Sequence, residues 1–477
     1  MKQYLLLLII SLPAMLYANT YTLRETSGNI VISNRSTSPS LRSGDTLYIP
    51  AAGNYNNVQY QHLMADTANK IHIIWLPGSM VSSPDVFQQS YDFNVVGVVI
   101  EQMRHYNWFG TRKESYNIHD VDFIGCSWIN PKGSYKPQPC IQWDDQFAAT
   151  PMIFAGKKAQ TFYNNRYIDC RFDGFFNVTV LQLGSNWNNT RQEINRSICL
   201  DFVFLRDTFM NVSNTAGTTV TAIAGTGFNA RVEACLFKNI SGPGAGHGAH
   251  NESILWYGTI DVLRSRQEDC YAAMLRAVPL AWTGLPGYRN EAACRFYRNI
   301  IVRQLNYSAV EFGQNNVGNR DAAHGFYPCK AICVYNTVYS TVRVTHNHPG
   351  YYYGFVCDVV NQDTIECKYN AGCKLEYDFP YDLKRGYAVA MVSKPALQSM
   401  VAENKIIRQY SKAVFTDTLS FAPGALLKLS APGKNYAFMD KDYYGRPLPA
   451  EGSSYAGAVE FAVTPNKPAA VKKKGLK

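Results

Sequence analysis

The clearest pattern in the chain is a short phrase of apolar and polar positions that recurs along its length. In the stretch 296–302, two aromatic residues precede a spacer, an Asn, a second spacer and two more apolar residues. Complete or partial copies place an amide or carboxylate at Asn165, Asp207, Asn239, Asn299, Asn336 and Asn404. The spacing is 32 residues from Asp207 to Asn239 and 37 from Asn299 to Asn336, and the gaps of 60 and 68 residues elsewhere are each about two such steps.

A period of roughly 20–50 residues is typical of stacked supersecondary units. The runs between copies are short, rich in β-branched and aromatic residues, and bounded by Gly, Asn, Asp and Ser, which predicts strands and not helix pairs. We therefore expect an all-β chain that forms a right-handed parallel β-helix, with one coil turn per repeat. The six Asn and Asp residues would then stack in one file at one corner, bonded to the backbone. A large β-sandwich with imprecise repeats is the alternative.

Half of the twelve cysteines follow nearly the same period. They are Cys170, Cys199, Cys235, Cys270, Cys294 and Cys329, separated by 29, 36, 35, 24 and 35 residues. Two interpretations fit: a column of buried thiols that pack as small apolar residues, or disulfides between neighbouring turns. Cys357, Cys367 and Cys373 lie closer together and are better disulfide candidates. A Cys-x-x-Cys motif is missing from the sequence, so a zinc or redox site has little support.

The start of the chain predicts export. Lys2 supplies a positive start, residues 5–12 an apolar stretch, and Ala18 a cleavage site, as in a secretory signal. Later segments lack about 18 unbroken apolar residues, so we expect no membrane span in the mature chain, which would be a secreted or periplasmic monomer. The expected parts are a signal peptide at 1–18, one β-helix domain at 19–462 and a disordered basic tail at 463–477.

The formal net charge of +10 changes this picture little. It favours an acidic partner, which we expect to be a polysaccharide and not a nucleic acid. Part of the excess lies in the tail, in the run 472–474, and is therefore not assigned to a site.

Two stretches near the ends carry a family resemblance. Residues 44–49 read Gly-Asp-Thr-Leu-Tyr-Ile, which resembles the opening turn of secreted β-helix proteins of the pectate-lyase-like superfamily. Residues 442–446, followed by 457–460, resemble the closing phrase of such proteins from polysaccharide-degrading bacteria, except that Arg446 directly follows the Gly. The resemblance covers roughly residues 20–462 and implies the fold. Because this fold includes lyases, hydrolases, epimerases and binding proteins, it implies much less about activity.

The turn expected near residue 269 lacks its Asn, and a break in local consistency is where function is expected. Arg264 and Arg266 lie two apart, so on one strand they would point to the same face and hold a uronate carboxylate. By analogy with the superfamily's lyases, one of them would remove the proton next to that carboxylate, which requires a lowered pKa. His247 and His250, in the preceding Gly-rich stretch, would assist. The four together are the predicted catalytic residues.

Other charged residues near this turn complete the predicted site. Arg295 and Arg298 are expected to bind substrate. Glu268 and Asp269 would bind substrate or calcium, which is the one cofactor we consider, or pair with the arginines. A charged corner in contact with solvent is the alternative for the whole group.

The sequence thus predicts an exported β-helix protein that binds and cleaves a uronate-containing polysaccharide by β-elimination. One alternative is a glycoside hydrolase, for which Glu252, Glu268 and Asp269 are the available carboxylates. The other is a non-catalytic carbohydrate-binding or surface protein.

Overall fold

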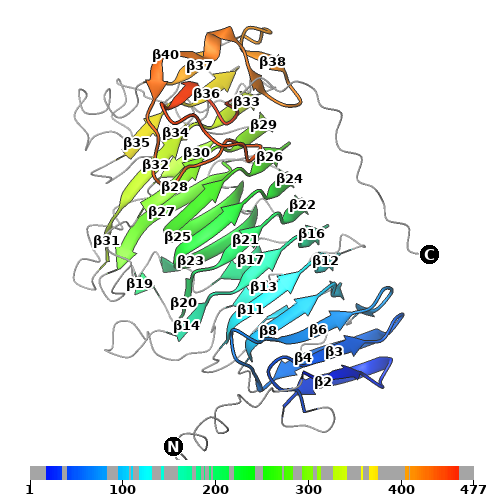
Figure 1. Cartoon of the computed structure of the whole chain (residues 1–477). Helices are drawn as coiled ribbons and strands as arrows, with labels where there is room; N and C mark the ends of the chain where they lie inside the picture. The colour runs from blue at the N-terminus through cyan, green and yellow to red at the C-terminus, as the bar shows by residue number, and fades with distance from the viewer. Residues whose placement is uncertain are drawn as a thin grey trace, which may run out of the picture.

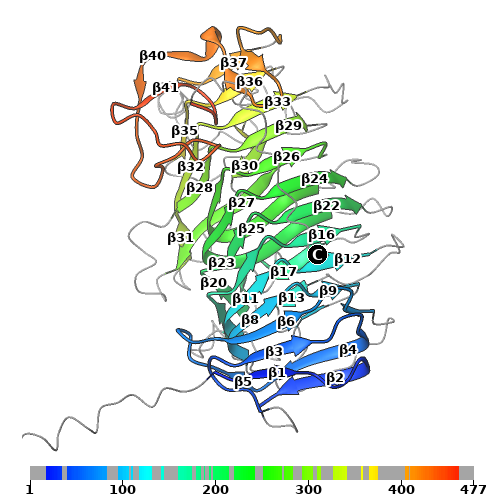
Figure 2. The ribbon, with the colours of Figure 1, turned by 45° about the vertical axis from the view of Figure 1, so that its right-hand side comes forward.

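The computed structural model places most of the chain on a long stack of parallel strands. It describes residues 18–34, 40–82, 95–106, 109–110, 118–130, 141–143, 160–174, 179–183, 187–188, 193–194, 197–213, 220–241, 251–270, 273–282, 293–304, 309–312, 326–340, 356–357, 365–373, 403–407 and 409–460. Figures 1 and 2 show the stack as an elongated coil, with the N-terminal turns in blue at one end. Nearly all of the predicted signal and tail lies outside the described residues.

Two large sheets form the coil. The first contains β1(Thr20–Thr22), β3(Thr46–Ile49), β5(Leu63–Met64), β6(Ile71–Trp75), β8(Val95–Glu101), β10(Phe109–Gly110), β11(Ile118–Ile124), β13(Ile141–Trp143), β14(Gln160–Tyr163), β15(Arg166–Ile168), β17(Thr179–Leu183), β20(Ser197–Leu200), β21(Val203–Leu205), β23(Val220–Glu233), β25(Asn251–Leu263), β27(Leu275–Trp282), β28(Ala293–Tyr297), β30(Val310–Phe312), β31(Phe326–Pro328), β32(Lys330–Val334), β34(Val356–Cys357) and β35(Ile365–Lys368). The second contains β2(Ser27–Ser33), β4(Asn54–Gln61), β7(Met80–Val81), β9(Arg104–His105), β12(Ser127–Ile129), β16(Arg171–Asp173), β22(Thr208–Ser213), β24(Leu236–Ser241), β26(Arg266–Glu268), β29(Ile300–Gln304), β33(Thr337–Ser340), β36(Ala371–Cys373) and β37(Lys405–Ile407).

Successive turns pair in parallel with little shift in register, so equivalent residues stack. Inward-facing side chains alternate with outward-facing ones, as the two-residue period of a strand requires. Inside the coil, Phe123, Tyr167 and Phe204 stack with ring centroids 5.0 and 5.1 Å apart. This confirms the predicted fold class, an all-β parallel β-helix. Within the described residues the structure has no α-helix, and hence no helix long and apolar enough to cross a membrane.

Two corners bound a narrow face of the first sheet. Residues with positive φ mark the first corner: Asp120, Asn164, Asp201 and Asn229. The second corner, where the chain passes into the second sheet, has φ between 49° and 65° at Gln102, Gly125, Asp169, Arg206, Ala234, Arg264, Arg298, Tyr335, Tyr369 and Glu403. Asn and Asp adopt this backbone region more readily than most residues, which accounts for the first corner. We name the short stretch between the corners, such as β15, the narrow face.

The predicted Asn ladder exists directly after the second corner. Asn299, Asn336 and Asn404 belong to it, together with Asn370, which the sequence phrase missed. Each Oδ1 accepts the backbone N–H of the residue one turn earlier, at 2.8–2.9 Å. Asp207 holds the same position and accepts the N–H of Cys170 at 2.7 Å.

The prediction of a single file is wrong for two residues. Asn165 lies at the first corner, where its Oδ1 accepts the N–H of Val121. Asn239 lies at a third, exposed corner, where it donates to Asn211. The expected break near residue 269 is also wrong, because Ser265 holds the ladder position and its Oγ accepts the N–H of Cys235 at 3.1 Å. A hydroxyl therefore does there what an amide does elsewhere.

The cysteines for which the structure describes side chains are free and buried. Cys126, Cys170 and Cys235 occupy ladder positions, and each thiol donates to a carbonyl of the preceding turn at 3.3–3.5 Å. The predicted buried thiols are thus confirmed, but the prediction of one column is wrong. Of the six cysteines, Cys170 and Cys235 hold ladder positions, whereas Cys199 lies in β20 and Cys294 in β28. Cys367 and Cys373, two of the three disulfide candidates, are buried and are not joined in a disulfide, and the side chain of Cys357 lies outside the described part.

Residues 409–460, here named the C-terminal segment, fold back onto the narrow face of the later turns (Figures 1 and 2, orange to red). The segment contains β38(Phe415–Asp417), β39(Ala422–Pro423), η2(Ala425–Leu427), β40(Lys428–Gly433) and β41(Ser453–Tyr455). It builds a second hydrophobic core outside the coil, in which Leu263, Tyr297 and Val334 of the narrow face contact its apolar side chains.

Candidate functional site

Arg264 and Arg266 do not share a strand. Arg264 occupies the second corner with φ 49°, and Arg266 begins β26, so the chain turns between them. Each guanidinium binds a carboxylate: Arg264 pairs with Glu233, and Arg266 Nε lies 2.7 Å from Glu268 Oε1. The prediction of one shared strand face is therefore wrong, because the bend at the corner separates the two side chains.

The C-terminal segment also contacts these two arginines. Arg266 Nη1 donates to the carbonyl of Leu419 at 3.5 Å, and its guanidinium lies over the ring of Phe421 at 5.7 Å. Arg264 Nη1 lies against Gly445, where an added Cβ would come within 3.6 Å of it. Both arginines are therefore engaged in packing between the coil and the segment.

Arg295 and Arg298 serve the same interface. Arg295 lies 3.2 Å from Asp261 Oδ1 and 5.1 Å from the centroid of Phe438. Arg298 is fully buried, and it donates to the carbonyl of Gly457 at 2.9 Å and to Ser453 Oγ at 2.6 Å.

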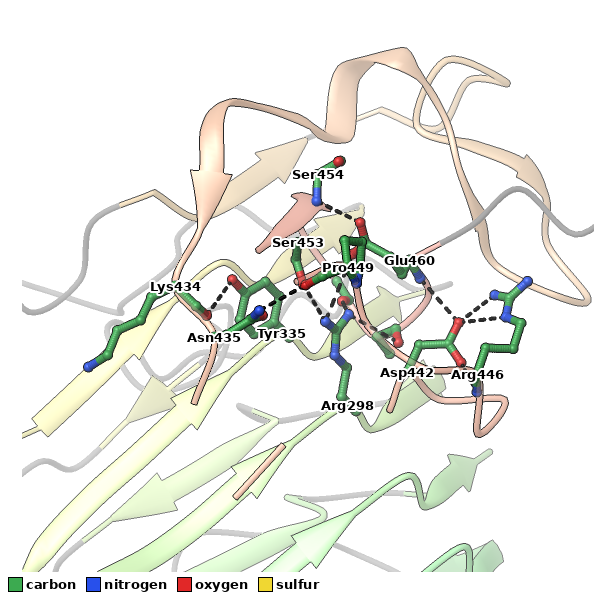
Figure 3. A network of polar contacts seen from close by, with 12 residues as sticks. Arg298, Tyr335, Lys434, Asn435, Asp442, Arg446, Pro449, Ser453, Ser454 and Glu460 are labelled. Carbon is green, nitrogen blue, oxygen red and sulfur yellow. Dashed lines mark hydrogen bonds and ion pairs between the residues drawn. The ribbon is translucent and has the colours of Figure 1, made fainter. Parts of the chain in front are cut away.

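Figure 3 shows Arg298 enclosed by these groups. Burial lowers the pKa of Arg298 to about 10. With no exposed surface, Arg298 anchors the C-terminal segment and is not placed to bind substrate.

The residues that carried the closing resemblance hold this segment together. Asp442 is buried and accepts the backbone N–H groups of Tyr444 and Arg446, both at 3.0 Å, as well as the Arg446 side chain. Glu460 accepts the N–H of Ser454 at 2.6 Å and lies 3.9 Å from Arg298. The same network appears in Figure 3. The residues of the closing phrase therefore stabilise the fold of the C-terminal segment and its contact with the coil.

Of the remaining predicted site residues, the structure describes Glu268 and Asp269. Burial alone would raise the pKa of Glu268, but Arg266 and Lys238 outweigh it and lower that pKa. Asp269 lies at the end of β26 with φ 52°, at the exposed third corner. His247 and His250 lie outside the described residues. Within the described part of the chain, His, Cys, Asp and Glu residues do not gather in groups of three or more that could hold a metal ion.

A different constellation occurs at the first corner, several turns earlier. His119 of β11 places Nδ1 2.6 Å from Asp120 Oδ2, and Asn164 donates to the other oxygen of Asp120. The His119 ring stacks on Tyr163 of β14, with centroids 4.0 Å apart and an interplanar angle of 13°. The parallel register places His119 and Tyr163 side by side. A carboxylate that binds Nδ1 fixes the imidazole orientation and leaves Nε2 to exchange protons with a ligand.

Nearby charges shift the pKa of Tyr163 and of Arg166. Burial raises the pKa of Tyr163, and the Asp120 carboxylate raises it further, so the phenol keeps its proton at neutral pH. Arg166 lies on the adjacent strand and binds Asp122 through Nε at 2.6 Å and Nη2 at 2.5 Å. The hydrogen bond to Asp122 raises the pKa of Arg166, and the charge of Asp120 adds to this. The first corner thus combines an imidazole–carboxylate pair with a phenol, and Arg166 begins the strand that follows the corner.

Sequence reasoning missed this corner. Asp120 and Asn164 lie in adjacent turns but are 44 residues apart in sequence, which is longer than the repeat. The available signals were the His119–Asp120 dipeptide and the repeat copy that contains Tyr163 and Asn164. Only the register shows that the two are neighbours.

Neither a family model nor a characterised protein matches this chain. What the fold and the corner define is thus a class: a parallel β-helix protein with a His–Asp–Tyr cluster at its first corner.

Proposed function

We propose that this protein binds a uronate-containing polysaccharide at the first corner, beside the narrow face, and cleaves it by β-elimination, with His119 as the base. The observation that carries the proposal is the 2.6 Å contact between His119 and Asp120, with the His119 ring stacked on Tyr163. It replaces the arginine set predicted from the sequence, whose members bind carboxylates and the C-terminal segment. The signal-like start and the resemblance to the pectate-lyase-like superfamily support export and membership of that superfamily as parts of the same proposal.

Each group has a distinct role in the proposed reaction. The Arg166 guanidinium stabilises the uronate carboxylate and the negative charge that develops beside it. His119 Nε2 takes the proton from the carbon next to the carboxylate. The C–O bond to the leaving sugar breaks as the carbon–carbon double bond forms, and the Tyr163 hydroxyl gives its proton to the departing oxygen. Solvent then removes the proton from the imidazolium and restores the phenol.

A second candidate function is glycoside hydrolysis, favoured by one buried cluster. Arg276 of β27 lies 3.2 Å from Glu252 Oε1 and 2.8 Å from Glu311 Oε1. Burial raises the pKa of Glu252 to about 7, which suits a general acid beside a second carboxylate. All three side chains are almost completely buried, however, whereas the first corner is partly exposed. The geometry therefore favours elimination.

The test is to incubate the protein with alginate, pectate and chondroitin sulfate and to follow ultraviolet absorbance together with reducing ends. Elimination produces both signals, since only it forms the conjugated double bond. We expect His119→Asn and Tyr163→Phe to reduce kcat by about 10²–10⁴-fold. The matched control is His72→Asn, which alters another imidazole–carboxylate pair of the same sheet, 3.1 Å from Glu101, and should retain activity.

Other outcomes separate the alternatives. Reducing ends without absorbance, lost in Glu252→Gln but kept in His119→Asn, would establish hydrolysis at the buried cluster. Neither signal from a folded protein that still binds the polymer would establish a binding protein and refute cleavage.

A further inference from the structure

We infer that the anionic polysaccharide lies along the narrow face in the direction of the coil axis, on a basic track that ends where the C-terminal segment begins. The inference rests on the proposed function for the class of ligand, but it concerns where the chain binds and not how it is cleaved.

The track consists of ion pairs in which the basic side chain is much more exposed than the acidic one. The pairs are Arg166–Asp122, Arg171–Asp173, Arg231–Glu233 and Lys238–Glu268. The basic side chains are 42–54% exposed, whereas the acidic ones are only 3–17% exposed. A ligand that approaches the second corner, with the narrow face on one side and β16 and β24 on the other, therefore meets cations first, although each is paired. Arg206, at the second corner between them, pairs with an Asp169 that is as exposed as itself.

The cations of the track belong to three consecutive turns. Arg166, Val203 and Arg231 are in register, so Arg166 and Arg231 stand two turns apart on the same line. At about 4.8 Å per turn, this separation is about 10 Å along the coil axis. Arg171 and Lys238 stand on the other side of the second corner, in β16 and β24. Such a line of positive charge suits a polymer with repeated negative charge and attracts it over a distance.

An apolar strip runs beside the cations. Ile124, Ile168 and Leu205 stack in register on the narrow face, and each remains partly exposed. Sugar rings present apolar C–H faces as well as charged substituents. A strip flanked by cations therefore fits a polyuronate better than it fits a polymer that is charged on every side.

The C-terminal segment limits the track. From Leu263 onward, the same line of narrow-face positions is buried against that segment, with Tyr297 next in register. The segment places Phe438 over Arg295, so the segment already occupies this face in the later turns. Arg166 and Arg231, in earlier turns, remain 42% and 46% exposed, so the track lies on a part of the face that the segment leaves open.

Binding is tested on intact polymer with His119→Asn as the background, since this change blocks the proposed cleavage. The track variant adds Arg171→Gln, Arg206→Gln, Arg231→Gln and Lys238→Gln. The matched control adds Lys330→Gln, Lys428→Gln, Lys434→Gln and Lys441→Gln, which remove four exposed lysines elsewhere. We expect polyuronate affinity, measured by calorimetry, to fall about tenfold or more in the track variant and to stay within about twofold in the control. Circular dichroism checks that both variants fold.

The results separate the two proposals. Equal affinity in the track and control variants would refute the track, whatever the wild type cleaves. A selective loss of affinity without any cleavage by the wild type would support the track and refute elimination. Equally tight binding of polyglutamate or single-stranded DNA would show a general polyanion surface and would refute a polysaccharide track.

Discussion

At the residue scale, Asp207 is the member of the interior ladder whose chemistry differs most from its neighbours. It is fully buried, and burial raises its pKa well above the usual value. Since the unfolded pKa is near 3.9, the stability that Asp207 contributes is complete below that pH and is lost as pH rises toward the folded pKa. An amide at this position makes the same hydrogen bond without this dependence.

We therefore expect Asp207→Asn to raise the free energy of unfolding at neutral pH by about 1 kcal/mol, and by less near pH 4. Urea unfolding of both proteins at the two pH values measures this difference. The partly exposed Asp201→Asn is the control and should change little. A variant less stable than the wild type at every pH would contradict the assignment of a neutral, amide-like carboxyl.

Ser265 provides a second prediction at this scale. Its Oγ accepts the buried N–H of Cys235, so Ser265→Ala leaves that donor without its acceptor and should cost about 1–3 kcal/mol. Ser265→Asn restores the ladder type found at Asn299 and should be tolerated. Thermal unfolding compares the two. An equal loss of stability in both variants would indicate that side-chain volume, and not the hydrogen bond, determines which residue is tolerated at position 265.

At the element scale, the corners show what the sequence could and could not predict. The repeat phrase indicated the coil because each copy carries the alternation that forms one turn. It could not assign Asn165 and Asn239 to their corners, because all three corners favour residues that adopt positive φ. It also missed Ser265 and the buried cysteines, whose side chains fill ladder positions without resembling Asn.

The docking of the C-terminal segment depends on Arg298, which explains why a charged residue is buried there. Arg298→Met removes the donor to Gly457 and Ser453 and leaves Glu460 without its cation, which should cost about 3–5 kcal/mol of docking free energy. We expect faster amide exchange and proteolysis within residues 409–460, while the early turns remain protected. The exposed Arg171→Met is the control. Unchanged protection of the segment would contradict its role as anchor.

At the scale of the whole molecule, the narrow face has two uses. In the later turns it takes up the C-terminal segment, and the arginines that the sequence singled out lie beneath it. In the earlier turns it presents Arg166 and Arg231 of the basic track, next to the first corner with His119 and Tyr163. Sequence analysis missed the candidate site because its partners, although they lie in adjacent turns, are far apart in the sequence. It missed the track because the sequence does not show which partner of an ion pair is exposed.

The central claim is that His119 acts as base in the elimination of a uronate polymer. The most direct measurement is the rate at which ultraviolet absorbance appears when purified wild type, His119→Asn and His72→Asn are each mixed with alginate or pectate. The account predicts absorbance that grows with wild type and with His72→Asn, and at least about 10²-fold more slowly with His119→Asn. Equal rates for all three proteins, or no absorbance from any uronate polymer, would contradict it.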